Sequence, residues 1–156
     1  MAADRLQQAL EIAFGFLAKR DRTVAETARR LESEAVDPAV ARQALAALIE
    51  QGYLDDARYA RRFTEDRRSL DGWGCRRIEQ RLVGAGVDAE LAQATVQRPH
   101  DVELEAAVAL LRRRLPHGAD QARERDRALG LLLRRGYDFE LACDAVREHS
   151  RTGRVA

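Results

Sequence analysis

Two helical patterns meet in the stretch Gly52-Tyr53-Leu54-Asp55-Asp56-Ala57-Arg58-Tyr59-Ala60-Arg61-Arg62-Phe63. Glycine readily adopts the left-handed backbone that ends many helices, so Gly52 predicts the end of the first pattern. Either Asp55 or Asp56 can cap the helix that follows, because a carboxylate favours the positive N-terminal end of a helix. The aromatic residues are spaced as on one helix face, and such residues usually pack inward. The residues expected in the core on this ground are Tyr53, Tyr59, Phe63 and, farther along, Ile78.

Helical periodicity continues on both sides of this stretch, and no segment shows the period-two alternation of a strand. Punctuation residues divide the chain into nine expected helices. We expect Asp4 to cap the first helix and the pair Thr23 and Glu26 to form a capping box on the second. Asp37 followed by Pro38 is a strong start for the third. Further breaks are expected at Gly72-Trp73-Gly74, Gly86 with Asp88, Pro99 before Asp101, Pro116-His117-Gly118, and Gly136 with Asp138.

The punctuation recurs about every fifty residues. Gly86-Val87-Asp88 aligns with Gly136-Tyr137-Asp138 at an offset of 50, and Ala35-Val36-Asp37 precedes the first of these by 51. One unit of this length buries little core alone, so neighbouring units are expected to stack. The sequence therefore predicts an all-α fold, an elongated, curved array of three tandem three-helix repeats with helix-turn-helix-like units. The expected repeats are 1–53, 54–99 and 100–156. The alternative is one compact bundle in which the similar turns are coincidental.

The composition is that of a globular protein, since 46% of the 156 residues are hydrophobic and 34% are charged. No apolar run approaches the roughly 18 residues that a membrane-spanning helix requires. The N-terminus lacks a signal-peptide pattern, so we expect a cytoplasmic protein. Cys75 and Cys143 have no metal-binding spacing and are expected to be buried or half-buried free thiols.

The sequence contains no recognisable catalytic motif. There is no phosphate-binding Walker loop, and Gly72-x-Gly74 lacks the third glycine of a dinucleotide-binding fingerprint. The three histidines form no zinc-binding or nucleophile motif. The pair Asp55-Asp56 has the chemistry of metal ligands, but helix capping is its simpler role. We therefore expect a protein that is not an enzyme and has no cofactor and no metal site.

The charges are arranged in blocks of alternating sign, although the net charge is only +1. Residues 24–57 carry −4, 58–81 carry +4, 82–111 carry −4 and 112–135 carry +5. The near-neutral average hides two basic segments that can face an acidic partner or DNA. Lys19 is the only lysine, a bias that codon usage in a GC-rich genome explains. Arginine richness by itself is therefore weak evidence for nucleic-acid binding, and a solvated face is the alternative for each arginine.

A series of motifs extends the opening stretch in both directions. The order glycine-aromatic-Leu-Asp-Asp-x-Arg-aromatic-Ala runs from Gly52 to Ala60. The other motif residues are Phe63, Arg67, Gly72-Trp73-Gly74, Arg77-Ile78, Leu82 and Gly86, with Leu17, Arg20, Thr23 and Glu26 upstream and Leu133-Arg134-Arg135-Gly136-Tyr137 downstream. In this order, over residues 9–146, the chain resembles the RecX family, the regulators of the RecA recombinase. It departs from the family pattern at Arg22, where histidine is common, at Asp71, where a basic residue is common, and at Cys75, where proline is common.

The resemblance implies an all-helical protein of three three-helix repeats that binds the RecA–DNA filament and has no reaction or cofactor of its own. It implies inhibition of filament growth, ATP hydrolysis, strand exchange and coprotease activity. The implied setting is homologous recombination, DNA repair and the SOS response. The implied structural residues of the family motifs are Gly52, Tyr53, Leu54, Asp55, Asp56, Tyr59, Phe63, Ile78, Gly86 and Gly136.

The candidate contacts to RecA or DNA are arginines of the basic segments and one tryptophan. They are Arg58, Arg61, Arg62, Arg67, Arg68, Trp73, Arg76, Arg77, Arg81, Arg112, Arg113, Arg114, Arg134 and Arg135. Trp73 is included because it stands in a glycine-flanked turn and tryptophan is enriched among interface anchors. Two alternatives are kept: a direct DNA-binding module whose Arg-rich helix enters a major groove, and a helical scaffold for another protein. Weak binding of single- or double-stranded DNA fits either of the first two functions, and no membrane contact is expected.

Overall fold

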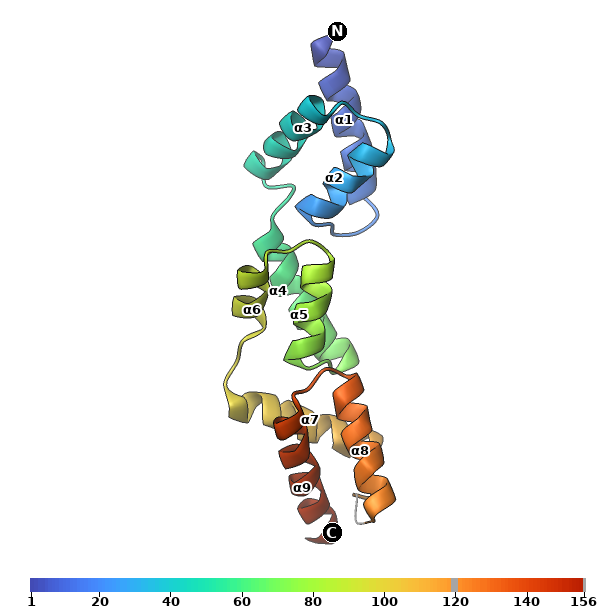
Figure 1. The fold of residues 1–156 in the computed structure, drawn as a ribbon, viewed down its shortest axis with the longest axis vertical. Coiled ribbons are helices and arrows are strands. Elements are labelled where there is room, and N and C mark those ends of the chain that lie inside the picture. The colour runs from blue at the N-terminus through green and yellow to red at the C-terminus, as the bar shows by residue number, and fades with distance from the viewer. Residues whose placement is uncertain (119–120, 156) are drawn as a thin grey trace. The chain divides into compact units, whose positions relative to one another are not determined.

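The computed structural model describes residues 1–118 and 121–155, and all regular structure in these residues is helical (Figure 1). The helices are α1 (Ala2–Leu17), α2 (Val24–Ser33), α3 (Pro38–Glu50), α4 (Asp56–Asp66), α5 (Cys75–Gly84), α6 (Ala89–Val96), α7 (His100–Arg114), α8 (Ala122–Arg134) and α9 (Phe139–Val155). A π-helical turn, Arg67–Asp71, continues α4. The predicted all-α class is confirmed, as are the nine helices within the described residues. The π-helical turn was not predicted.

Two helices begin at the caps that the sequence predicts. On α2 the backbone N–H of Glu26 donates to Thr23 Oγ1 at 3.0 Å, and the backbone N–H of Thr23 donates to Glu26 Oε1 at 3.1 Å. The capping box is thus complete and satisfies two of the free N–H groups at the helix start. The carboxylate of Asp37 accepts a backbone hydrogen bond of 2.8 Å ahead of α3, whose first residue is Pro38.

At two other helix starts one predicted acidic cap is wrong and one is confirmed. The predicted cap at Asp4 is wrong, because α1 already begins at Ala2. Asp4 lies in the first turn and pairs with the N-terminal amine at 3.6 Å. At α4, Asp55 accepts from the backbone N–H three residues on at 3.0 Å, which holds its pKa below the usual value. Asp56 instead accepts from the backbone N–H of Val24 at 3.0 Å, so only Asp55 caps the helix that it precedes.

The step between the second and third helix of each repeat is closed in the same way. One residue is left-handed in each: Ala35 with φ 58°, Gly86 with φ 95° and Gly136 with φ 92°. Its N–H donates to the carbonyl three residues back, and the next N–H donates to the carbonyl five residues back, at 3.0–3.1 Å in all three steps. This is the double hydrogen bond of a Schellman-type helix end. The recurrence confirms the predicted tandem three-helix repeats. The predicted helix stop at Gly52 is also confirmed, with φ 80°.

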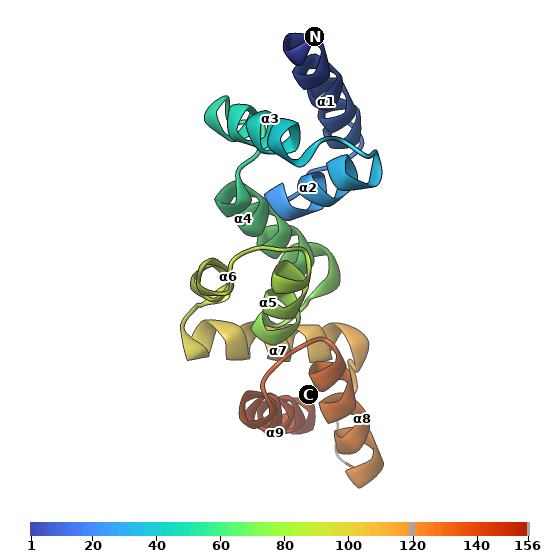
Figure 2. The same cartoon turned by 45° about the horizontal axis from the view of Figure 1, so that its top comes forward.

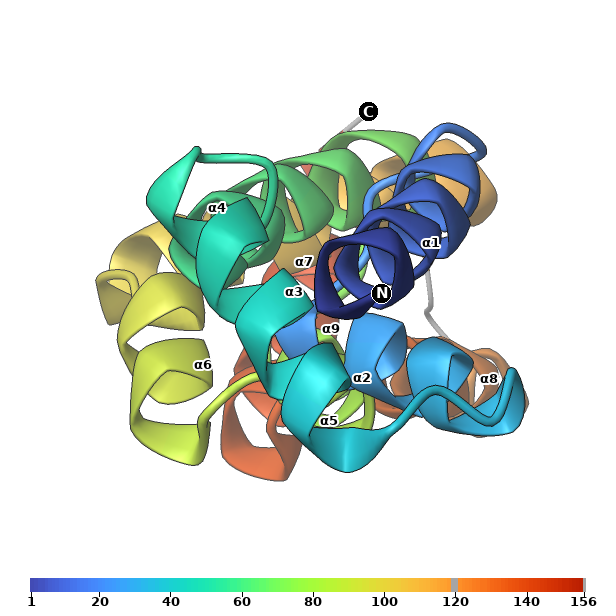
Figure 3. The same cartoon turned by 90° about the horizontal axis from the view of Figure 1, so that it is seen from above.

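The chain forms two compact units, each with its own core. Unit 1 contains Met1–Arg62 and Leu82–Ala92, and unit 2 contains Phe63–Arg81 and Gln93–Ala156, so the middle repeat contributes to both. In unit 1, α1, α2 and α3 pack together, as Figure 3 shows from the N-terminal end, around Ala13, Leu31 and Leu48 among other residues. In unit 2, α9 packs on α7 and α8 around a core that includes Leu111, Leu132 and Ala142. The predicted boundaries between the repeats stay a prediction.

In unit 1 the left-handed turn of the second repeat packs on the start of α2 in the first repeat. Thr23 Oγ1 donates to the carbonyl of Ala85 at 2.6 Å. The backbone N–H of Val24 donates to Asp56 Oδ1, the contact described above. One free N–H group at the start of α2 is thus satisfied by a carboxylate of the next repeat, and the cap residue of α2 contacts the turn of that repeat.

An equivalent contact joins the second and third repeats in unit 2. The backbone N–H of Gly74 donates to the carbonyl of Arg135 at 2.7 Å, and the backbone N–H of Cys75 donates to Glu103 Oε1 at 3.1 Å. A turn carbonyl and a carboxylate therefore meet the start of α5 as they meet the start of α2. Figures 1 and 2 show the α8–α9 turn lying beside the start of α5.

The predicted core placement holds for two of the four aromatic or branched residues of the family motif. Tyr59 and Ile78 are buried, and Phe63 is half-buried. The core placement of Tyr53 is wrong, because 54% of this residue is exposed. It follows the left-handed turn and lies edge-on against the ring of Phe14 with centroids 5.0 Å apart. The next residue, Leu54, takes the core position instead.

Candidate partner-binding surface

Several of the predicted arginines meet around a hollow of about 370 Å³ in unit 2, which we call the arginine hollow. It is lined by Arg67, Leu70, Asp71, Trp73, Arg77, Arg114 and Arg135. These residues come from the π-helical turn and the residues after it, the start of α5, the end of α7 and the α8–α9 turn. An adjoining hollow shares Leu70, Asp71, Arg114 and Arg135 and adds Leu110 and Arg113. Arginines from the two basic segments of the sequence thus share one surface.

Trp73 forms the floor of the arginine hollow. Only 8% of it is exposed, and the guanidinium of Arg77 lies 4.0 Å from the ring centroid. The guanidinium groups of Arg67 and Arg81 lie 5.7 and 5.6 Å from it. Cation–π attraction therefore holds three arginines around one ring. The predicted contact of Trp73 with a partner stays a prediction, but the ring offers a partner little surface and mainly orders the arginines.

The π-helical turn is held in place by the third repeat. Arg135 Nη1 donates to the carbonyl of Asp71, and the hydroxyl of Tyr137 donates to the carbonyl of Gly72 at 2.9 Å. Burial raises the pKa of Tyr137 to about 12, so its hydroxyl keeps the proton that it donates. Within the turn, Arg67 pairs with Asp71 at 2.5 Å. The side chain of Leu70 therefore projects from a backbone that has little freedom to move.

The fourteen candidate contacts differ in how they are placed. The exposed arginines are Arg61 and Arg62 in unit 1 and Arg76, Arg81, Arg112, Arg113, Arg114 and Arg134 in unit 2. Four half-buried arginines bond backbone carbonyls. Arg58 Nη2 donates to Gly52 O at 2.9 Å and Arg68 Nη2 to Val96 O at 2.5 Å, while Arg77 Nη1 donates to Arg134 O at 3.1 Å and Arg135 Nη1 to Asp71 O. Arg58 and Arg68 thus stabilise the fold, whereas the exposed arginines have side chains available to a partner.

A buried polar cluster in unit 2 was missed by the sequence reasoning. The carboxylate of Glu103 bonds Arg98 Nε and accepts from the thiol of Cys75 at 2.9 Å. Burial acts to raise the pKa of Glu103, but the hydrogen bonds from Arg98 and Cys75 hold it below its usual value. Burial, together with the Glu103 carboxylate, raises the pKa of Cys75, so this group stays a thiol. Both cysteines are free and half-buried, as predicted.

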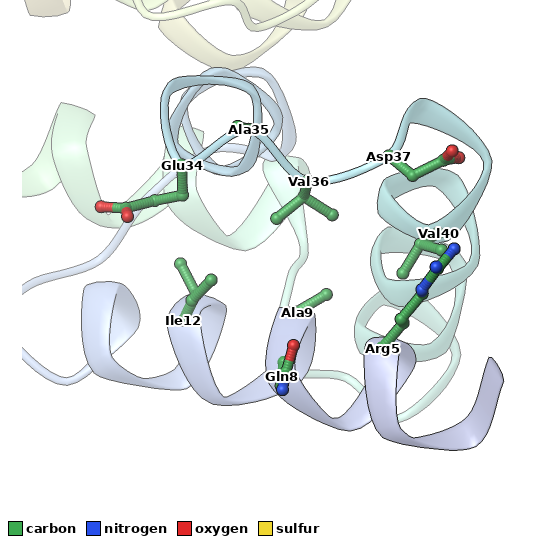
Figure 4. A pocket seen from close by; sticks show the side chains of 9 residues that line it. All are labelled: Arg5, Gln8, Ala9, Ile12, Glu34, Ala35, Val36, Asp37 and Val40. Atoms are coloured by element: carbon green, nitrogen blue, oxygen red, sulfur yellow. The ribbon is translucent and has the colours of Figure 1, made fainter. Parts of the chain in front are cut away.

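A second hollow, of about 440 Å³, lies in unit 1 between α1 and the α2–α3 turn (Figure 4). Apolar side chains such as Ile12 and Val36 point into it, and Arg5 and Glu34 stand at its rim. Ala35, the left-handed residue of the first repeat, belongs to its wall. None of the candidate contacts lines this hollow.

The hollow in unit 1 corresponds to a place that is filled in the second repeat. In the second repeat the equivalent turn contacts the start of α2. The first helix of that repeat, α4, supplies the carboxylate of Asp56, which accepts a hydrogen bond from the start of α2. Arg5 lies 51 residues before Asp56, the offset of the repeat, and so has the opposite charge at the equivalent position. The N-terminal end of a helix is positively polarised. Asp56 therefore attracts the start of α2, whereas Arg5 would repel a helix start at the equivalent place.

In the described residues, 1–118 and 121–155, no group of three or more metal-binding side chains could hold a metal ion. No helix in this part of the chain is long and apolar enough to cross a membrane.

Comparison with known proteins places residues 55–96 on the family model for the second three-helix domain of RecX. The chain is 33% identical over 148 residues to the regulatory protein RecX of Leptothrix cholodnii, covering 94% of this chain and 93% of that protein. It is 38% identical over 135 residues to the regulatory protein RecX of Trichlorobacter lovleyi, with 83% and 87% covered. Its fold is similar to the crystal structure of RecX from Lactobacillus salivarius, with a TM-score of 0.82, 21% identity, and 96% and 99% of the chains covered.

Proposed function

This chain belongs to the RecX family of regulatory proteins, and from this premise we propose that it binds the RecA–DNA filament and inhibits it. The proposed action covers filament growth, ATP hydrolysis, strand exchange and coprotease activity. The protein performs no reaction of its own and needs no cofactor. It works in the cytoplasm, where RecA assembles on DNA.

The observation that supports this proposal most directly is the arginine hollow. Its rim carries Arg67, Arg77, Arg114 and Arg135 against one carboxylate, Asp71, which already pairs with Arg67. Arginine is enriched at protein interfaces because its planar, multiply donating head group suits carboxylates and phosphates. A filament of protein on DNA presents both kinds of anion. Complementary charge would speed the encounter and fix the register of binding.

The competing function is direct DNA binding without RecA. The α5–α6 pair is a helix–turn–helix step, and Arg76 and Arg81 are exposed on α5, which favours this alternative. A net charge of +1 counts against it, because binding of bare DNA depends largely on phosphate neutralisation. A direct binder should lose affinity for bare DNA steeply as salt rises.

The test is the ATP hydrolysis of RecA on single-stranded DNA, with this protein titrated in below the RecA concentration. We expect inhibition at a small molar fraction, because one bound molecule acts on an assembled filament and not on a single RecA subunit. A suitable control is the same protein after heat denaturation. Unchanged hydrolysis at equal concentrations of the two proteins would refute the proposal.

A further inference from the structure

Leu70 lines the arginine hollow, but attraction between the arginines and an anionic partner does not explain why a leucine is exposed there. It is 72% exposed, and among the large hydrophobic residues found exposed in the described chain only Met1 is more so. Exposing a leucine to this extent gains no hydrophobic stabilisation for the folded monomer. A single exposed leucine is ordinary, but this one stands on the rim of a hollow lined by four arginines.

The backbone beneath Leu70 is specialised in the second repeat. The π-helical turn Arg67–Asp71 extends the first helix of this repeat. In the first repeat the equivalent helix ends at Leu17. A π-helical turn is rare and is frequently found at functional sites. Leu70, the exposed residue, lies within this turn.

The turn is also preorganised. Its carbonyls are bonded by Arg135 and Tyr137 from the third repeat, and the backbone N–H of Trp73 donates to the carbonyl of Arg67 at 3.2 Å. Binding therefore costs little additional ordering of the backbone, which is the condition under which one side chain contributes strongly to affinity.

We propose that Leu70 and the arginines around it form the docking surface for an acidic segment of the filament protein, which presents an apolar pocket flanked by carboxylates. This inference rests on the proposed function and names the chemistry of the partner surface. Leu70 enters the apolar pocket, and Arg77 and Arg114 meet the carboxylates on its two sides. An apolar centre with an arginine rim is the ordinary arrangement of a protein–protein interface.

The apolar centre is the reason for assigning the surface to protein and not to the DNA backbone. Phosphates are met by cationic and polar side chains, and an apolar side chain adds nothing to such contacts. The aromatic ring of the hollow, Trp73, is buried beneath Arg77 and is not available for stacking on bases. The geometry thus favours an apolar-and-acidic partner surface.

The experiment compares two variants, Leu70→Ser and Arg114→Glu, with two matched controls. Leu133→Ser removes another exposed leucine that does not line the hollow, and Arg151→Glu reverses an exposed charge of α9 that does not line it and is not a candidate contact. All four proteins are first compared by circular dichroism and thermal unfolding. The concentration for half inhibition of RecA ATP hydrolysis and the affinity for bare single-stranded DNA are then measured for each.

We expect Leu70→Ser and Arg114→Glu to raise the half-inhibitory concentration at least about tenfold, the loss typical of a central interface residue. The two controls should change it less than about twofold. Leu70→Ser should leave the affinity for bare DNA unchanged. This combination supports the docking surface.

Three outcomes contradict the docking surface. If the wild type inhibits and neither variant changes inhibition, the surface is wrong and the proposed function stands. If Arg114→Glu weakens DNA binding and inhibition by the same factor while Leu70→Ser weakens neither, the surface binds phosphates. If the wild type itself fails to inhibit, the proposed function is refuted, and the assignment of the surface to the filament is refuted with it.

Discussion

Replacing Gly136 by alanine adds a methyl group where the stacked repeats leave no room for one. The new Cβ would lie 2.2 Å from the Cβ of Arg77 and 2.5 Å from its backbone nitrogen. Overpacking of this kind costs about 1–3 kcal/mol. The left-handed backbone, with φ 92°, costs a residue with a side chain about 1–2 kcal/mol more. Alanine restricts the unfolded chain, which offsets about 0.4–1 kcal/mol. The expected net loss of stability is about 3 kcal/mol.

Gly52→Ala is the matched control, because Gly52 has φ 80° but no atom within 4 Å of its added Cβ. Only the backbone cost applies to it, so its expected loss is about 0.5–1 kcal/mol. Urea unfolding followed by circular dichroism at 222 nm measures both values. Equal losses for the two variants would refute the close packing of the third-repeat turn on the start of α5.

Three further substitutions test particular contacts. Ala35→Gly should raise the free energy of unfolding by about 0.5–1 kcal/mol, because Ala35 has φ 58° without the freedom of glycine; an unchanged urea midpoint would contradict this. Arg77→Ala should destabilise by about 1 kcal/mol through exposure of Trp73, whereas Arg76→Ala, an exposed neighbour, should be neutral in the same thermal scan. Because the pKa of Glu103 is lower in the folded state than its ordinary value of 4.5, the stability that it provides is present above pH 4.5 and is lost as the pH falls below it. The stability difference between wild type and Glu103→Gln should therefore narrow below pH 4.5 in urea titrations, and a constant difference would count against the buried ion pair.

The local signals of the sequence predicted the helices well. The capping box of Thr23 and Glu26, the start at Asp37 and Pro38, and the stop at Gly52 all depend on residues within one turn of each other. Such hydrogen bonds form whatever the rest of the chain does, so a sequence pattern is enough to find them. The repeat was found for a similar reason, since its turns need a left-handed residue at a fixed place.

Ala35 shows why the repeat tolerates one exception. At the equivalent positions, Gly86 and Gly136, two constraints require glycine. The backbone is left-handed, and an added Cβ would approach Ala25 or Arg77 of the preceding repeat. No repeat stands in that place next to Ala35 within the described residues, so only the backbone cost applies there.

The long-range contacts were not predictable from spacing. Glu103 follows Asp56 by 47 residues, whereas Gly136 follows Gly86 by 50, so the two equivalent carboxylates do not align at the repeat offset. Their shared role appears only when both are seen to accept a hydrogen bond from the start of a helix in the preceding repeat.

The candidate surface was predicted only as a set of residue types. Charge blocks pointed to the arginines, but which of them are exposed depends on partners far along the chain, such as Val96 for Arg68. The π-helical turn and the exposure of Leu70 left no signal in the sequence pattern. The curvature of the array stays a prediction.

The most direct test of the central account is the affinity of the labelled wild-type protein for RecA filaments and for bare single-stranded DNA, measured by fluorescence anisotropy at low and moderate salt. The account predicts binding to the filament that is at least about tenfold tighter than to bare DNA, with the preference growing as salt rises, because phosphate contacts weaken fastest. Equal affinity for the two, with the same steep salt dependence, would contradict it and identify the protein as a DNA-binding module.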